Sequence, residues 1–136
     1  MTRLFFNPFT GRFFTLIARR KPRKAPAGAQ VEKLRAQAKE ALPPRLAQLA
    51  AQHGFTYNKV FIKNNVSNWG SCSSKGNINL NLRLVGLPQE LQDYVMLHEL
   101  CHLKYLNHGK EFHALLESMC PGHRELARQM KNYKIR

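Results

Sequence analysis

The segment HELCH, residues 98 to 102, carries the side chains best suited to chemistry. His98 and His102 stand four residues apart, which on a helix stacks two imidazoles about 5–6 Å apart at their β-carbons. Both can then bind a single zinc ion. Glu99 follows the first histidine, where a glutamate takes a proton from the metal-activated water and does not bind the metal. The motif therefore predicts a zinc hydrolase with Glu99 as general base.

A catalytic zinc site usually has three protein ligands, so one more is needed. His108 stands six residues after His102, which is the spacing of the HExxHxxGxxH signature, although Tyr105 stands where that signature has glycine. Glu117 and His113 are the competing candidates, together with water. We favour His108 as the third ligand.

A helix must present this motif. Pro88 suits the first turn of a helix, and apolar residues fill the segment that follows, so the helix is expected to run to about Leu106. Further helices are expected at about 110–119 and after Pro121. Burying two histidines and a glutamate in so apolar a helix requires a partner for them, and a metal ion supplies one.

Two segments alternate as strands do. Residues 56–63 form one, and residues 78–85 form another after a turn at Lys75, Gly76 and Asn77. A small antiparallel sheet is therefore expected. The alternation of 78–85 predicts one buried and one more exposed face, formed respectively by Ile78, Leu80, Leu82 and Leu84 and by Asn79, Asn81 and Arg83.

The chain before this sheet has two parts. Residues 1–27 are predicted to be a basic N-terminal segment, with two short strands around a turn at residues 7–11 and a linker from Ala25. Residues 28–136 are predicted to be the catalytic domain. It is expected to begin with two helices, over 30–42 and 45–52, separated by the pair Pro43 and Pro44.

Composition limits the class of protein. A chain of 136 residues with 43% hydrophobic side chains can bury one core. The net charge is +14, and residues 1–24 hold seven basic side chains and no acid, which makes nucleic acid or another anionic surface a candidate partner. Three cysteines without CxxC spacing argue against a disulfide framework. A reducing cytoplasm is therefore the expected compartment. No apolar run approaches the roughly 20 residues of a membrane span, so a soluble protein is expected.

Two longer motifs, WGSCSSKGNINLNLRL and LPQELQDYVMLHELCHLKYLNHGKEF, resemble the YgjP-like family of predicted zinc metallopeptidases, which is similar to the SprT-like and WLM metallopeptidases. The resemblance covers about residues 28 to 134. It implies a minimal zincin-like α+β domain with zinc at His98, His102 and His108 and with Glu99 catalytic. The chain departs from the family at Asn68, where Arg is usual, and at His113, where Trp is usual.

The segment Trp69, Gly70, Ser71 and Cys72 also has a physical interpretation. A strand beside the active-site helix can pair its backbone with an extended peptide substrate. Trp69 equally suits a core anchor, and Cys72 suits a small buried residue better than a nucleophile. The function expected is zinc-dependent peptide hydrolysis. The alternatives are a metalloprotease recruited to nucleic acid by the basic N-terminus and a metal-binding domain without hydrolytic activity.

A hydrolase of this kind also needs a donor that stabilises the oxyanion of its transition state. Tyr105, His113 and Arg83 are the candidates, and the sequence does not rank them.

Overall fold

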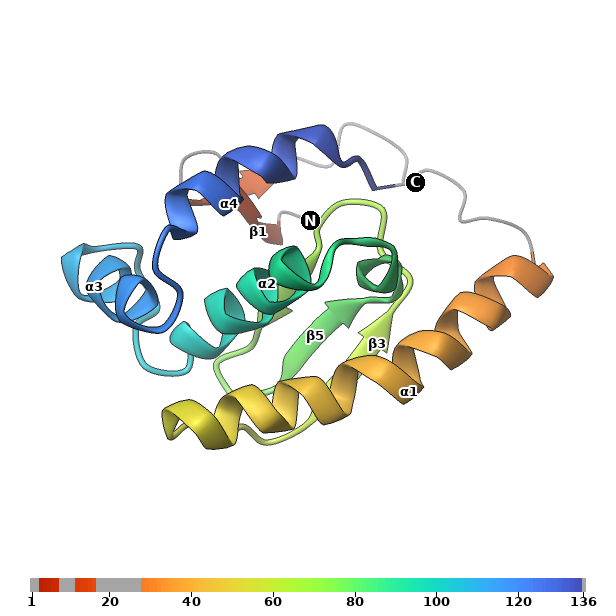
Figure 1. Ribbon diagram of the computed structural model, residues 1–136, viewed down its shortest axis with the longest axis horizontal. Coiled ribbons are helices and arrows are strands. Elements are labelled where there is room, and N and C mark those ends of the chain that lie inside the picture. Colours follow the sequence, from red (N-terminus) through yellow and green to blue (C-terminus); the bar gives the residue numbers. More distant parts are fainter. Residues whose placement is uncertain (1–2, 8–11, 17–27, 136) are drawn as a thin grey trace.

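The computed structural model describes residues 3–7, 12–16 and 28–135, which combine helices with small sheets in an α+β fold (Figure 1). The expected turn at residues 8–11 and the expected linker at 25–27 lie outside the described residues. The two N-terminal strands, β1 (Arg3–Asn7) and β2 (Arg12–Leu16), pair antiparallel with Arg3 opposite Leu16. The two expected strands and their pairing are confirmed.

Helix α1 is one continuous element, Gly28–His53, and it contains both Pro43 and Pro44. The prediction that these prolines separate two helices is wrong. A proline leaves the carbonyl four residues earlier without its helical partner, but Lys39 and Glu40 are exposed, so water can bond those carbonyls. The apolar stripe through the proline pair is buried, and its packing outweighs the lost hydrogen bonds. The stripe consists of Ala38, Leu42, Leu46 and Leu49.

The central sheet has three strands in the order β3 (Val60–Lys63), β5 (Ile78–Asn81), β4 (Gly70–Cys72). Strands β4 and β5 are antiparallel through the expected turn, where Gly76 has φ +82°. Strand β3 runs parallel to β5, so the prediction of an antiparallel sheet is wrong for this pair. The chain passes from β3 to the other side of β5 before it forms β4, which leaves β3 and β5 pointing the same way.

The strand expected over 78–85 ends at Asn81, and a 3-10 helix, η1 (Leu82–Gly86), follows. The predicted burial of the apolar residues is confirmed for all four, and Asn79 is more exposed as predicted. Asn81 and Arg83, however, are buried, so their predicted exposure is wrong. The Asn81 side chain accepts a hydrogen bond from the Arg83 N–H at 2.9 Å, which turns the chain out of the strand and ends the two-residue alternation.

Helix α2 (Gln89–Cys101) is shorter than predicted, because the chain leaves the helix at His102 and not near Leu106. The His102 N–H bonds the carbonyls of Glu99 and Leu100, and turns continue from there. Helix α3 confirms the helix expected near 110–119, and a final helix α4 follows Gly122 as expected. These last elements are α3 (Lys110–Met119), α4 (His123–Gln129) and the 3-10 helix η2 (Met130–Asn132).

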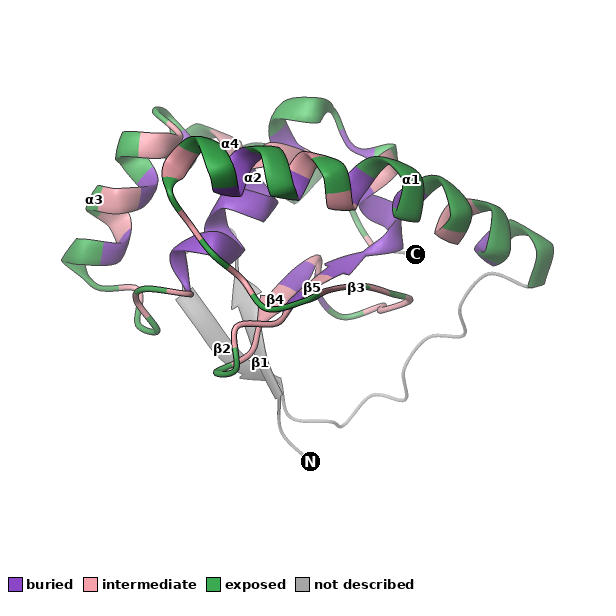
Figure 2. Ribbon diagram, turned by 90° about the horizontal axis from the view of Figure 1, so that it is seen from below, coloured by how far each residue is buried: buried purple, intermediate pink, exposed green. Residues whose placement is uncertain are grey.

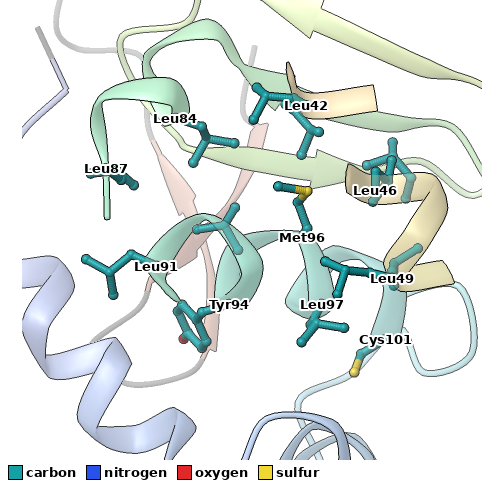
Figure 3. Packing of buried hydrophobic residues seen from close by; sticks show 14 of the residues in the cluster. Leu42, Leu46, Leu49, Leu84, Leu87, Leu91, Tyr94, Met96, Leu97 and Cys101 are labelled. Atoms are coloured by element: carbon teal, nitrogen blue, oxygen red, sulfur yellow. The ribbon is translucent and has the colours of Figure 1, made fainter. Parts of the chain in front are cut away.

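The core lies between α1, α2 and the three-stranded sheet (Figure 2). Close packing joins the buried side chains of α1 to those of α2, with Met96 of α2 lying near Leu46 of α1 (Figure 3). From Tyr94 to Cys101 every residue of α2 is buried, which fixes the part of the helix that carries the HELCH motif. Within the described residues, no helix has the length and apolar content needed to cross a membrane.

Candidate metal centre

The end of α2 and the loop after it bring three histidines together. His98 lies in the last turn of α2, His102 follows its end, and the loop before α3 returns His108 to the same place. One ring nitrogen from each lies within 4.8 Å of the others. Among the described residues this is the only group of three or more His, Cys, Asp or Glu side chains with such geometry.

The ring nitrogens are oriented by the surrounding backbone. Nδ1 of His102 lies 3.0 Å from the carbonyl oxygen of Tyr105. A carbonyl only accepts hydrogen bonds, so Nδ1 of His102 carries the proton and Nε2 is the nitrogen that can bind a metal. A backbone partner of this kind fixes the tautomer and the ring orientation of a metal-binding histidine.

The spacing of one pair of ring nitrogens fits zinc. Nε2 of His98 and Nε2 of His108 lie 3.2 Å apart. Two nitrogen ligands at about 2.0–2.1 Å from a tetrahedral zinc ion lie about 3.3 Å from each other. The nitrogen donor set and its spacing therefore suit zinc without rearrangement of these two rings.

Phe112 of α3 covers one side of the histidine cluster. Its ring centroid lies 4.9, 4.7 and 4.5 Å from those of His98, His102 and His108. Burial among these rings lowers the pKa of His102 to about 4 and that of His108 to about 3, and it holds the pKa of His98 well below its ordinary value. All three imidazoles are therefore neutral at pH 7, as metal ligands must be.

Glu99 is fully buried beside this cluster. Burial raises the pKa of its carboxyl group to about 7, and the nearby His102 partly opposes that rise. One carboxylate oxygen lies 3.5 Å from Nδ1 of His98, and neither oxygen has a hydrogen-bond partner among the described residues. A buried polar group without such a partner costs free energy, so its presence here calls for a functional reason.

Gly70 of β4 lies directly against Glu99. A β-carbon built on Gly70 would lie 3.2 Å from Cγ and 3.3 Å from Oε2 of Glu99, and 3.2 Å from the carbonyl oxygen of Asn79. The glycine of the WGSC segment therefore leaves the space that the Glu99 side chain occupies. Any side chain at residue 70 would displace either the carboxylate or the strand.

The outer edge of β4 faces away from the sheet at two residues. The Asn81 N–H donates to the Trp69 carbonyl at 2.9 Å, which makes residues 69 and 81 a hydrogen-bonded pair. Because such pairs alternate in antiparallel sheets, the N–H and C=O groups of Gly70 and Cys72 point outward from β4. Within the described residues no strand pairs with that edge, although β1 passes within 8 Å of β4, measured between Cα atoms.

The other sequence candidates lie around this centre. Glu117 is exposed, and its carboxylate accepts a hydrogen bond from the Gly122 N–H at 3.1 Å and lies 3.4 Å from Nε2 of His123. The ring of His113 stacks on that of His123, and its centroid lies 6.4 Å from that of His108. The structure therefore brings neither Glu117 nor His113 into the group of three histidines.

Two residues of the WGSC segment adjoin the core. Trp69 is half-buried and packs against the hydrophobic core. Burial raises the pKa of the Cys72 thiol to about 12, so it is a thiol at neutral pH.

A model of the YgjP-like metallopeptidase domain matches residues 15–133. The chain belongs to the YgjP-like family of metallopeptidase domains. It is therefore a metal-dependent peptidase, a hydrolase of peptide bonds. No relative among curated proteins matches this YgjP-like chain.

The solved structures that resemble this YgjP-like chain include two metallopeptidase zymogens. The metallopeptidase zymogen abylysin of Pyrococcus abyssi is 27% identical, with a TM-score of 0.57, over 75% of this chain and 93% of that one. The metallopeptidase zymogen jannalysin of Methanocaldococcus jannaschii is 23% identical and shares the fold with a TM-score of 0.57, over 64% of this chain and 90% of that one.

Sequence reasoning missed three contributors to this YgjP-like site. Phe112 is one, and its signal was its apolar character at helical spacing from Leu116, which marks the inward face of α3. The contact of Gly70 with Glu99 is another, signalled only by a glycine inside a strand pattern. Asn81 is the third, because polar residues in an alternating strand read as solvent-facing when their hydrogen bonds are unknown.

Proposed function

We propose that this YgjP-like domain is a zinc peptidase in which His98, His102 and His108 hold the metal and Glu99 is the general base. The observation that carries the proposal is the convergence of the three histidine nitrogens beside a fully buried glutamate. A zinc ion bound there would supply a Lewis acid that lowers the pKa of water and polarises a carbonyl.

Glu99 has the properties of a base and not of a ligand. It lies outside the group of three histidine nitrogens, and its raised pKa of about 7 lies where a group accepts and returns protons efficiently near neutral pH. In this role Glu99 takes a proton from water and passes it to the leaving amine of the peptide. The buried position keeps other water away from that proton.

The peptide substrate is proposed to lie along the outer edge of β4. The outward N–H groups of Gly70 and Cys72 and the C=O of Cys72 can hydrogen-bond an extended backbone, as in strand addition, while the C=O of Gly70 accepts from the Asn68 amide. Gly70 is also the residue in contact with Glu99, so a peptide on this edge would lie next to the base. The segment Trp69, Gly70, Ser71 and Cys72 is therefore the proposed substrate-binding strand.

The test is Glu99→Gln, measured for zinc content and for cleavage of a peptide that the parent cleaves. The amide is nearly isosteric, so zinc should remain at the parental stoichiometry while turnover falls by about 10²- to 10⁴-fold. His102→Ala serves as the control that should lose zinc, because it removes one of three ligands. Full zinc with undiminished turnover in Glu99→Gln would refute the mechanism. A parent that binds zinc but cleaves no member of a peptide library would favour the metal-binding domain without hydrolytic activity.

A further inference from the structure

Buried polar side chains hold the loop that leads into β4, residues 64–69, and Asn81 makes most of the bonds. Asn81, 1% exposed, donates both of its amide hydrogens to this loop, to the carbonyl of Asn65 at 2.8 Å and to that of Asn68 at 2.9 Å. Its backbone N–H donates to the carbonyl of Trp69 at 2.9 Å. Asn81 therefore bonds three loop carbonyls, two through its side chain and one through its backbone.

Two further side chains complete this attachment. Arg83, which is also buried, donates to the carbonyl of Asn65 at 2.8 Å and to Oδ1 of Asn81 at 3.4 Å. Asn68 is 3% exposed and donates its amide to the carbonyl of Gly70 at 3.1 Å. The polar contacts thus run from Asn81 through Asn68 to the first residue of β4. In a buried setting such linked hydrogen bonds are individually strong and fix one conformation.

The chain of contacts ends at Glu99. Glu99 has no hydrogen bond to its carboxylate oxygens among the described residues, so packing decides where the carboxylate lies. The backbone of Gly70 is part of that packing, because it leaves room for Glu99 and no more. A shift of the loop that moved Gly70 would therefore move the wall against which the carboxylate rests.

We propose that Asn81 is a positioning residue for Glu99, acting through the loop 64–69 and Gly70. The proposal deepens the proposed hydrolytic function and rests on it, because Glu99 matters here as the base. Asn81 touches neither the metal ligands nor the peptide edge of β4. Its effect should therefore fall on turnover and not on metal content.

The test is Asn81→Asp in the full-length, zinc-loaded protein. Aspartate has the same shape and still accepts from Arg83, but its carboxylate cannot donate to the carbonyls of Asn65 and Asn68. Released from those bonds, the loop should shift and kcat should fall by roughly 10- to 100-fold, the range that a misplacement of about 1 Å produces. Zinc content should stay at the parental value and KM should change less than kcat. Asn132→Asp, the same change at an exposed residue, is the matched control and should leave kcat unaltered.

A second readout does not depend on activity. Trp69 is the only tryptophan of the chain and lies in the loop itself, so its fluorescence reports release of the loop directly. In Asn81→Asp its emission should shift, and in the Co²⁺-loaded protein the visible absorption should change in the same direction as in Glu99→Gln. Asn68→Ala, which removes only the bond to the Gly70 carbonyl, should act in the same way more weakly, and it serves if Asn81→Asp fails to fold.

The outcomes separate this proposal from the proposed function. A shifted Trp69 emission with kcat within twofold of the parent would overturn the positioning role, because the loop would move without moving the base. An unshifted emission with parental kcat would overturn it as well. If the parent itself binds zinc but cleaves nothing, the proposed function fails. The positioning role is then decided by the Co²⁺ absorption, and a spectrum equal to that of the parent overturns it.

Discussion

Asn81 and Glu99 are both buried polar side chains, on elements that pack together, yet their surroundings differ. The Asn81 amide uses both hydrogens and its oxygen in hydrogen bonds to the loop 64–69 and to Arg83. The Glu99 carboxylate has no hydrogen-bond partner among the described residues and lies against Gly70 and beside His98. The fold itself satisfies the hydrogen-bonding groups of the Asn81 amide. The Glu99 carboxylate, in contrast, is left for a bound metal, water or substrate to use.

This difference in hydrogen bonding distinguishes a side chain that stabilises the fold from one that serves function. A buried amide with every hydrogen bond made fixes a conformation and contributes to the native state. A buried carboxyl group without partners lowers the stability of the metal-free protein. It is tolerated when a bound metal, water or substrate uses it.

The metal-free protein should lose stability steeply as the pH falls from about 6.5 to about 4. The pKa values of His98, His102 and His108 lie below the ordinary 6.5 in the folded state, so the unfolded state binds more protons in this window. Each extra proton costs about 1.4 kcal/mol per pH unit, so three histidines cost up to about 4 kcal/mol per unit. Glu99, whose pKa is raised to about 7, works in the opposite direction and offsets about one of these protons.

Urea denaturation of chelator-treated protein across that pH range measures this loss. Glu99→Gln provides the control, because removing the one opposing group should make the loss at acid pH steeper than in the parent. Stability that stays level between pH 6.5 and 4.5 in the metal-free protein would mean that the histidines are not held neutral by the fold.

Replacement by leucine should lower the free energy of unfolding at Asn81 and raise it at Glu99. Asn81→Leu leaves the carbonyl of Asn68 without its donor and the carbonyl of Asn65 with only its bond from Arg83, which should cost about 2 kcal/mol of unfolding free energy. Glu99→Leu replaces a carboxyl group that has no partners by an apolar one of similar size. It should stabilise the metal-free protein by about 1–2 kcal/mol. Denaturation of both variants in the presence of a chelator at pH 7 gives the comparison.

Zinc supplies the control for that pair, since the three histidines proposed to bind it are intact in both variants. Each should still gain stability when zinc is added. If Glu99→Leu and Asn81→Leu lost similar amounts of stability, the carboxylate would be part of the structural framework, and the contrast between the two regions would be wrong.

The sequence predicted the fold best where side-chain pattern and local chemistry agree. The hairpin, the turn at Gly76 and the burial of Ile78, Leu80, Leu82 and Leu84 follow from alternation and turn residues. The prediction failed where tertiary contacts override local rules. The apolar stripe of α1 keeps one helix through Pro43 and Pro44, and β3 pairs in parallel because the connection crosses over β5.

The site divides in the same way. The spacing of His98, His102 and His108 predicted that they meet, because helical geometry and a short loop are local properties, and the structure brings them together. The surroundings of Glu99 were not predictable from spacing. Gly70 lies 29 positions away along the chain, and its contact with Glu99 depends on how β4 packs against α2. Roles that depend on such packing become visible only in three dimensions.

The smallest effect should come from a polar pair that belongs to neither region. Arg45 of α1 and Asp93 of α2 form a two-point ion pair, with distances of 2.9 and 2.6 Å, and both side chains are partly exposed. Asp93→Asn should cost less than about 1 kcal/mol, because water solvates both groups when the pair is broken. Added salt should reduce the difference further, whereas the effect of Asn81→Leu should be insensitive to salt. Denaturation at low and high NaCl measures both.

A loss above about 2 kcal/mol in Asp93→Asn would show that half-exposed ion pairs stabilise this fold as much as the buried amide does. Burial with complete hydrogen bonding would then no longer explain why Asn81 matters more.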